Sequence, residues 1–326
     1  MASSRRSPIN LVLGAANIGD ATADPMVRFD TPDEVSGFLN TFVKRGYSHI
    51  DTSRIYSAHA PGTSESRIGA VIGKEYAIDT KVNSLQDGGH SVANIASDID
   101  ASLEALRVDH IHTEYLHIPD RKTDFKEACE AMDLAYKTGK IKQWGICNHT
   151  AEEVETFLKI CEKNGYVKPR VYQGQYNPIV RGGEKELLPF LRQHGMAFYA
   201  YSPAGAGFFA GNHKKIQAGG RFDQSLFLGG LYSSFYLKPS IMEVTDKALE
   251  LASQHGIGGH AAALRWTAYH SVLDKAYGDS ILIGASSVEQ LETNIDAIEA
   301  GPLPDEVACA LEAIYGEIDD EISYHM

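Results

Sequence analysis

Short apolar segments alternate with longer segments of helical periodicity along nearly the whole chain. Apolar residues three or four positions apart mark one face of a helix, whereas a short continuous apolar run is typical of a strand buried on both faces. Eight such runs predict strands, at Asn10–Leu13, His49–Asp51, Ile78–Val82, Ile111–Ile118, Ile141–Cys147, Val171–Tyr176, Ala197–Tyr201 and Ile281–Ile283.

Helices are expected between these strands. Thr31 is a candidate N-cap, because Pro32 follows at the first helical position and Glu34 stands three residues after the cap. Gly46 is expected to end this helix. The other segments with helical spacing are Ser64–Gly73, Ile95–Leu106, Asp124–Thr138, Val154–Gly165, Glu184–His194, Ile241–His255, Val288–Glu299 and Asp305–Glu321.

Regular alternation of strand and helix predicts parallel strands, since each return to the sheet needs a crossover. Eight such units favour a (β/α)8 TIM barrel with long loops at the C-terminal face and an added C-terminal helix, as one domain over residues 1–326. A doubly wound open sheet is the main alternative. It would normally carry a glycine fingerprint after its first strand, and the turn LGAANIG does not have that spacing. The glycine-rich stretch Pro203–Lys238 is predicted to be an irregular lid or ligand clamp.

Composition narrows the classes of function. A net charge of −13 disfavours binding to nucleic acid or to an anionic membrane. No apolar window approaches the roughly 18 residues that a membrane-spanning helix needs. The four cysteines, none of them in a C-x-x-C pair, indicate free thiols and a cytoplasmic location; they are Cys129, Cys147, Cys161 and Cys309.

Titratable residues follow three neighbouring predicted strands. Asp51 and Lys81 end the second and third strands, His117 lies near the end of the fourth, and Tyr56 stands in the loop after Asp51. The C-terminal ends of barrel strands form the active face, so these groups are expected to meet there. Each residue alone is ordinary, as a turn cap, a solvated lysine, a buried histidine or a loop tyrosine. Together they suit carbonyl reduction: the Lys81 ammonium would lower the pKa of Tyr56, the proton donor, Asp51 would hold Lys81, and His117 would position the carbonyl oxygen.

These four residues match the Asp/Tyr/Lys/His tetrad of the aldo-keto reductases. Segments such as GTSESRIG, YLHIPDR, GKIKQWGICN, VYQGQYN and GASSVEQLETN resemble the aflatoxin aldehyde and succinic semialdehyde reductase branch, especially its fungal members. The resemblance covers nearly the whole chain. It implies NADPH-dependent reduction of an aldehyde or ketone with Tyr56 as general acid, a role in fungal secondary metabolism, and a homodimer such as occurs among relatives.

The resemblance also implies where NADPH binds, extended over the barrel mouth. Asn148 and Gln173 would bond the nicotinamide carboxamide beside Cys147, which replaces the usual serine, and Tyr201 would stack on the ring. Backbone N–H groups at Ser202, Gly205 and Gly207 would contact the pyrophosphate, and the adenosine phosphate would be held by Ser286, Gln290 and Asn294. Plain helix capping by Ser286, Ser287 and Gln290, and a flexible glycine turn, are the alternatives.

Two further positions leave alternatives open. Asn212 stands where relatives often carry lysine, so the phosphates would be contacted by Lys214, Lys215 or Arg221, and NADH use is the alternative. Arg221 matches an arginine that binds a substrate carboxylate in relatives, or else it anchors the long loop through a salt bridge.

Two other functions are compatible with a barrel of this kind. An NADPH-binding regulatory subunit with little turnover would carry the same tetrad, whereas a phosphate-handling barrel lyase or isomerase would not need it. His110 and His112 share one strand face, but no carboxylate or cysteine at a suitable spacing joins them, so no metal site is expected.

Overall fold

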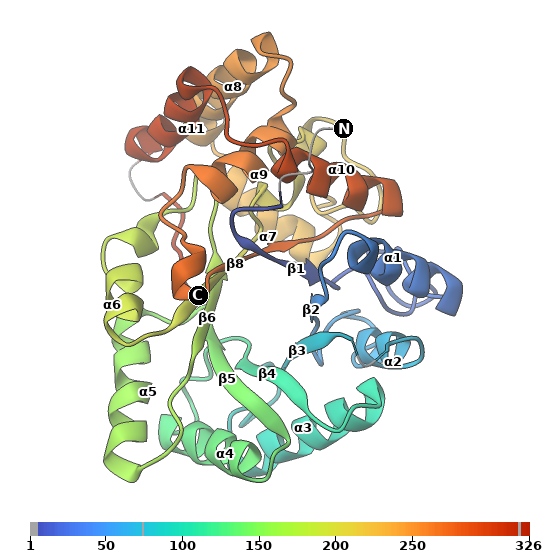
Figure 1. The fold of residues 1–326 in the computed structure, drawn as a ribbon, viewed down its shortest axis with the longest axis vertical. Helices are drawn as coiled ribbons and strands as arrows, with labels where there is room; N and C mark the ends of the chain where they lie inside the picture. The colour runs from blue at the N-terminus through green and yellow to red at the C-terminus, as the bar shows by residue number, and fades with distance from the viewer. Residues whose placement is uncertain (1–5, 74, 319–320) are drawn as a thin grey trace.

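The strands form a closed parallel barrel in chain order (Figure 1). The computed structural model describes residues 6–73, 75–318 and 321–326. β1 pairs with both β2 and β8, which closes the barrel, so the TIM-barrel prediction is confirmed. Each observed strand lies within two residues of its predicted bounds. The strands are β1 (Asn10–Gly14), β2 (His49–Asp51), β3 (Ala77–Lys81), β4 (Ile111–Leu116), β5 (Ile141–Cys147), β6 (Val171–Gln175), β7 (Ala197–Tyr201) and β8 (Ser280–Ile283).

Helices surround the barrel and shield the outer faces of the strands (Figure 1). The capping box of Thr31 and Glu34 is present at the start of the first helix. None of the helices in the described residues is both long enough and apolar enough to span a membrane. They are α1 (Pro32–Lys44), α2 (Thr63–Gly69), α3 (Val92–Leu106), α4 (Phe125–Lys137), α5 (Ala151–Asn164), α6 (Leu187–Gln193), α7 (Phe227–Tyr236), α8 (Pro239–Gln254), α9 (Gly259–Tyr269), α10 (Val288–Glu299) and α11 (Asp305–Ile318), with short 3-10 turns η1 (Gly182–Glu184), η2 (Gly205–Gly207), η3 (Asn212–Lys214) and η4 (Lys275–Tyr277).

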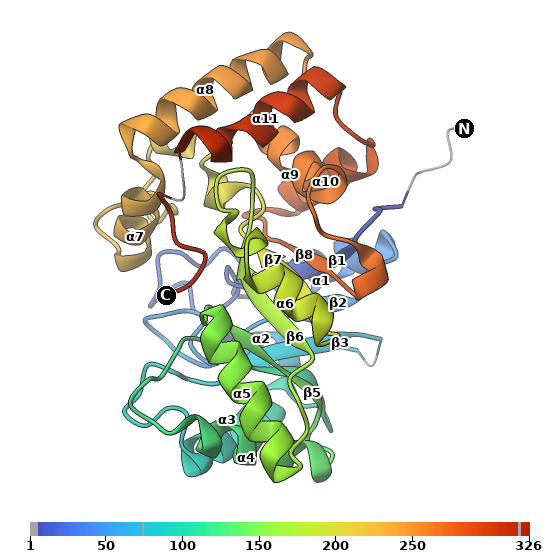
Figure 2. The ribbon, with the colours of Figure 1, turned by 90° about the vertical axis from the view of Figure 1, so that its left-hand side faces the viewer.

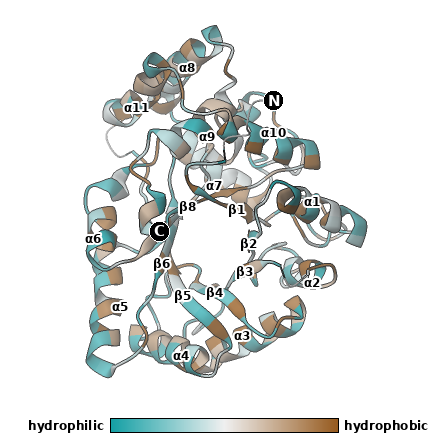
Figure 3. Cartoon of the chain, viewed as in Figure 1, coloured by the Kyte–Doolittle hydropathy of each residue, from teal (hydrophilic) through white to brown (hydrophobic). Residues whose placement is uncertain are grey.

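Two apolar cores stabilise the fold. The larger one lies between the strands and the helices, whose surfaces carry both hydrophobic and hydrophilic residues (Figure 3). The smaller one fills the barrel interior, so the barrel is packed rather than an open channel. Its buried members are Val12, Tyr115, Cys147, Val171, Tyr199 and Leu282.

Two helices differ from the sequence prediction. α7 lies inside the stretch predicted to be irregular, although Gly229 and Gly230 disfavour a helix. Tyr236 at its end anchors it, because the hydroxyl accepts hydrogen bonds from Gln175 and Asn177. α9 was not predicted from the sequence. Most of its residues are buried, so apolar and polar residues do not alternate with the helical period.

Glu114 on β4 is a buried carboxyl group whose two oxygens have no hydrogen-bond partner among the described residues. Burial raises the pKa of Glu114 well above its ordinary value, and the nearby charges of Glu65 and Asp98 add to the shift. The folded protein therefore retains a proton here that the unfolded chain loses above about pH 4.4. The contribution of Glu114 to the free energy of unfolding is therefore greatest at low pH, where the carboxyl group is protonated in both states, and it decreases as pH rises.

We predict that Glu114→Gln becomes more stable relative to wild type as pH rises. The difference in unfolding free energy between the two proteins should grow by about 1.4 kcal/mol for each unit by which burial raises the pKa. Urea unfolding at pH 4, 6 and 8 measures it. Glu104→Gln, at an exposed position of α3, is the control and should show no such trend. A difference that does not change with pH would show that Glu114 is ionised in the fold.

Candidate active site

The four predicted tetrad residues meet at the C-terminal end of the barrel. Asp51 and Lys81 end the adjacent strands β2 and β3, and His117 follows the end of β4. Tyr56 lies in the loop after β2, with its ring centroid 5.9 Å from that of His117. Neighbouring parallel strands bring these side chains together because their C-terminal ends share one edge.

Lys81 is the centre of this cluster. Its Nζ lies 2.5 Å from Asp51 Oδ1 and donates to the Thr52 carbonyl at 2.7 Å and to the Tyr56 hydroxyl oxygen at 3.4 Å. The three N–H bonds of an ammonium are thereby used. Gln173 Nε2 donates to the other Asp51 oxygen at 2.8 Å. The ion pair is fully buried, so these contacts replace the water that each charge has lost.

The pKa of Tyr56 differs from the sequence expectation. Burial raises it to about 12, and the Lys81 charge opposes this increase without overcoming it. Burial lowers the pKa of Lys81, but the Asp51 charge outweighs that effect, so the lysine pKa is raised and the ammonium persists. The phenol therefore stays protonated across the physiological range.

His117 is neutral and held by a residue that the sequence analysis missed. Burial, with the Lys81 charge, lowers the pKa of His117 well below its ordinary value. Its Nδ1 lies 3.0 Å from Ser53 Oγ, which also accepts a hydrogen bond from the Ile55 N–H. The Ser53 hydroxyl has a hydrogen available to donate to Nδ1, and that direction of the bond corresponds to the tautomer with its ring proton on Nε2. Its position two residues after Asp51 in the same strand-end loop was the available signal.

Residues expected to bind nicotinamide lie beside the tetrad. Tyr201 Oη donates to Asn148 Oδ1 at 2.8 Å, and Asn148 Nδ2 donates to the His117 carbonyl at 3.0 Å. Cys147 is buried in the barrel interior. Asn148 and Ser202 both have positive φ, 63° and 54°. Such strain in residues other than glycine is concentrated at functional sites.

The loop after β7 contains the glycines that are expected to contact the pyrophosphate. Gly205 and Gly207 have φ of 59° and 94°, conformations that L side chains rarely adopt. A Cβ at Gly207 would approach the Asn212 amide nitrogen to 2.4 Å. This tight turn lies at the barrel mouth and begins four residues after Tyr201, the last residue of β7.

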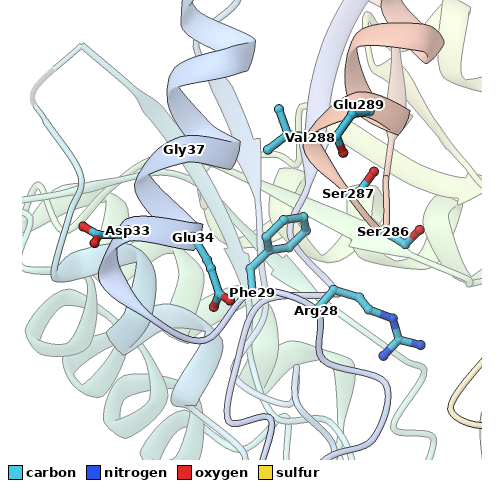
Figure 4. Close-up of a pocket in the computed structure, with 9 residues that line it drawn as sticks. All are labelled: Arg28, Phe29, Asp33, Glu34, Gly37, Ser286, Ser287, Val288 and Glu289. Carbon is cyan, nitrogen blue, oxygen red and sulfur yellow. The ribbon is translucent and has the colours of Figure 1, made fainter.

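The start of α10 shows the contacts of the capping alternative. Ser287 caps the helix by accepting from the Gln290 N–H, and Gln290 Oε1 accepts from the backbone and side chain of Ser286. Asn294 Nδ2 donates to the Gly284 carbonyl at 3.1 Å. Ser286 and Ser287 also line a cavity of about 300 Å³, in which Arg28 is the basic residue (Figure 4).

Arg221 anchors the long loop in this structure, although its partner is an amide rather than an acid. Its Nη2 donates to Asn17 Oδ1 at 3.0 Å, and Asn17 Nδ2 donates to the Ala285 carbonyl. Arg28 Nη2 similarly donates to the Gly219 carbonyl at 2.7 Å. Lys214 forms an exposed ion pair with Asp246. The loop is thus tied to the segments that follow β1 and β8.

The C-terminal tail also contacts the barrel mouth, which the sequence did not reveal. The Met326 N–H donates to the Asn148 carbonyl at 2.9 Å, and Arg121 Nη2 donates to Met326 at 2.7 Å. α7 lies at this same end of the molecule (Figure 2). The residues around Asn148 therefore receive contacts from the far end of the chain.

The histidines of β4 are arranged differently from the sequence expectation. His112 lies beside a carboxylate, Asp79 of β3, and near His49 of β2. His110 is exposed and does not belong to this group. Residues within one strand indicated no further ligand, whereas the neighbouring strands β2 and β3 place His49 and Asp79 beside His112.

Comparison with known proteins identifies the family of this chain. The model of the aldo/keto reductase family matches residues 10–316. An aldo-keto reductase of Pseudocercospora fijiensis is 35% identical over 290 residues, 86% of this chain and 97% of the relative. The oxidoreductase sirO of Leptosphaeria maculans is 34% identical over 95% of each chain. Human aflatoxin B1 aldehyde reductase member 2 is 33% identical over 93% of this chain and 86% of its own. The chain therefore belongs to the aldo/keto reductase family and is an oxidoreductase that acts on carbonyl compounds.

Proposed function

We propose that this protein reduces an aldehyde or ketone to an alcohol with NADPH, and that Tyr56 is the general acid. The observation that carries the proposal is the position of Lys81, whose Nζ is in contact with both the Tyr56 hydroxyl and the Asp51 carboxylate. NADPH, when bound, supplies the hydride through its nicotinamide ring. The chain's own residues handle the proton and the orientation of the carbonyl.

Tyr56 can donate its proton although the pKa of the phenol is about 12. An alkoxide formed from a carbonyl is more basic than a phenolate, so the transfer is favourable. Lys81, 3.4 Å from the phenol oxygen, stabilises the phenolate that remains. Asp51 keeps the lysine charged and in place. The lysine thus acts after the proton has left, rather than by making the resting phenol acidic.

His117 orients the carbonyl oxygen toward Tyr56. Because the ring is neutral and Ser53 contacts Nδ1, the Nε2–H group is available to donate a hydrogen bond. A neutral imidazole holds the carbonyl oxygen by a hydrogen bond but is a much weaker acid than an imidazolium ion. Tyr56 is therefore left as the residue that delivers the proton. Ser53 is accordingly a positioning residue that fixes the tautomer.

Cofactor contacts follow the barrel rim. Asn148 and Gln173 would bond the nicotinamide carboxamide next to Cys147, and Tyr201 would stack on the ring. The N–H groups of the turn containing Ser202, Gly205 and Gly207 would contact the pyrophosphate. The adenosine phosphate would bind in the cavity at the N-terminus of α10, which Arg28 also lines (Figure 4). Ser286, Gln290 and Asn294 would then give up the hydrogen bonds that they make in this structure and contact the phosphate instead.

The substrate proposed is an aldehyde of fungal secondary metabolism, on the strength of the relatives named above. Arg221 would bind a substrate carboxylate only after releasing Asn17.

Free cysteines, three of them buried, support a cytoplasmic location. A regulatory subunit is the second candidate, and it would bind NADPH tightly yet turn over very slowly.

We predict that Tyr56→Phe lowers kcat for aldehyde reduction by about 10²- to 10⁴-fold, the usual contribution of a general acid, while NADPH affinity stays within a factor of three. NADPH oxidation followed with a panel of aldehydes gives kcat, and fluorescence quenching on NADPH addition gives affinity. Tyr232→Phe, in α7, is the matched control. Wild-type turnover no higher than that of Tyr56→Phe would refute the enzyme proposal and favour the regulatory one.

We also predict that Arg28→Gln discriminates between the two nicotinamide cofactors. If the 2′-phosphate of NADPH lies beside Arg28, the variant should lose about tenfold in NADPH affinity and little in NADH affinity, since a charged hydrogen bond is worth about 1.5–3 kcal/mol. Lys247→Gln, which removes an exposed ion pair on α8, is the control. Equal losses for both cofactors would place the phosphate elsewhere.

A further inference from the structure

A second cluster of titratable side chains lies toward the opposite end of the barrel from Tyr56. His49 is the first residue of β2, Asp79 is the third of β3 and His112 is the second of β4. These strands are neighbours in the barrel (Figure 1). One nitrogen from each imidazole and one Asp79 oxygen all lie within 4.8 Å of one another.

Asp79 is the fixed centre of the group. Its side chain is fully buried, with His112 Nδ1 2.8 Å from Oδ1 and His49 Nε2 2.9 Å from Oδ2. His49 Nε2 is buried against Asp79 Oδ2 and has no other hydrogen-bond partner among the described residues. The two rings are nearly perpendicular, at 84°, with centroids 4.9 Å apart.

Neighbouring hydroxyl groups support the same arrangement. Tyr115 Oη donates to Asp79 Oδ2 at 3.3 Å, and Thr113 Oγ1 lies 3.1 Å from His112 Nδ1. The bond from Tyr115 orients the Asp79 carboxylate, as outer-shell bonds do in metal sites. Thr113 contacts the His112 nitrogen that faces Asp79, and this contact would be released when an ion binds. His49 also lines a cavity of about 270 Å³ beside the cluster, whereas Asp79 and His112 do not line it.

The geometry points to a binding site for a divalent transition-metal ion, of the Zn²⁺ class, held by His49, Asp79 and His112. Two imidazoles and one carboxylate are a common protein ligand set for zinc, and a fourth position would be taken by water from the cavity. Ca²⁺ and Mg²⁺ fit poorly because they require mainly oxygen ligands. Tetrahedral bonds of about 2.0–2.1 Å separate ligand atoms by about 3.3 Å. Each imidazole nitrogen would move a few tenths of an ångström away from Asp79, and the ligand atoms, which now lie within 4.8 Å of one another, would draw together around the ion. Binding of the ion would release the protons that these groups now carry.

Positive charge at the cavity is the main opposing factor. Arg6 and Lys275 line it and would repel a dication. The alternative is that the histidines simply share protons with Asp79 and bind no metal. Zinc titration separates these two possibilities.

The experiment uses the untagged full chain, treated with chelator and dialysed, at pH 7.5. Isothermal titration with ZnCl2 should show one Zn²⁺ per chain, and thermal unfolding should shift to higher temperature with added Zn²⁺. His112→Gln should weaken Zn²⁺ binding at least about tenfold and abolish the thermal shift. Since His112 is about one-third exposed, this variant should fold.

His110→Gln is the matched control, because it removes an exposed histidine of the same segment and should bind Zn²⁺ like wild type. His49→Asn is a second ligand variant and should behave like His112→Gln. Co²⁺ in place of Zn²⁺ should give the visible absorption of a tetrahedral ion in wild type and in His110→Gln, but not in the two ligand variants. Absence of Zn²⁺ binding, or equal binding by wild type and His112→Gln, would overturn the proposal.

Discussion

The buried ion pair of Lys81 and Asp51 is the interaction on which the active end of the barrel depends. Neither charge is exposed to water, so each must be satisfied by protein groups. Strand geometry provides them, because β2 and β3 end side by side and Thr52 and Gln173 supply the remaining hydrogen bonds. A lysine held in this way can neither deprotonate easily nor leave the phenol of Tyr56.

Burial has two opposite effects on this site. It raises the pKa of Tyr56, which makes the resting phenol a poorer acid, and it strengthens the attraction between Lys81 and any phenolate that forms. Around this centre, Asn148 and Ser202 retain positive φ, a strain of about 1–3 kcal/mol each that the rigid strands tolerate. The packed barrel interior links the two ends, since Tyr115 lies near Lys81 and also contacts Asp79.

Local sequence patterns predict most of the strands and helices of the fold. Apolar runs define the strands, and Thr31 with Glu34 marks a helix start that the structure reproduces. Features that depend on tertiary context were not predictable in this way. α7 is fixed by hydrogen bonds to Tyr236, and α9 has no polar face to reveal its period.

The candidate site shows the same division. Strand-end positions were enough to bring the tetrad together, because the C-terminal ends of parallel strands share an edge. The net pKa of Tyr56 depends on burial, which the spacing of residues does not reveal. Likewise, the contact between Asp79 and His112 joins two different strands, and Met326 contacts Asn148 from a distant part of the sequence.

The central claim is that Lys81 promotes reduction through the phenol of Tyr56. The most direct test is the single-turnover rate of NADPH oxidation for Lys81→Met, Tyr56→Phe and the double variant, all saturated with cofactor. If the lysine acts by stabilising the phenolate, it has nothing to act on once the hydroxyl is gone, so the double variant should react as fast as Tyr56→Phe alone. Losses that multiply in the double variant would contradict the account, because Lys81 would then act independently of Tyr56.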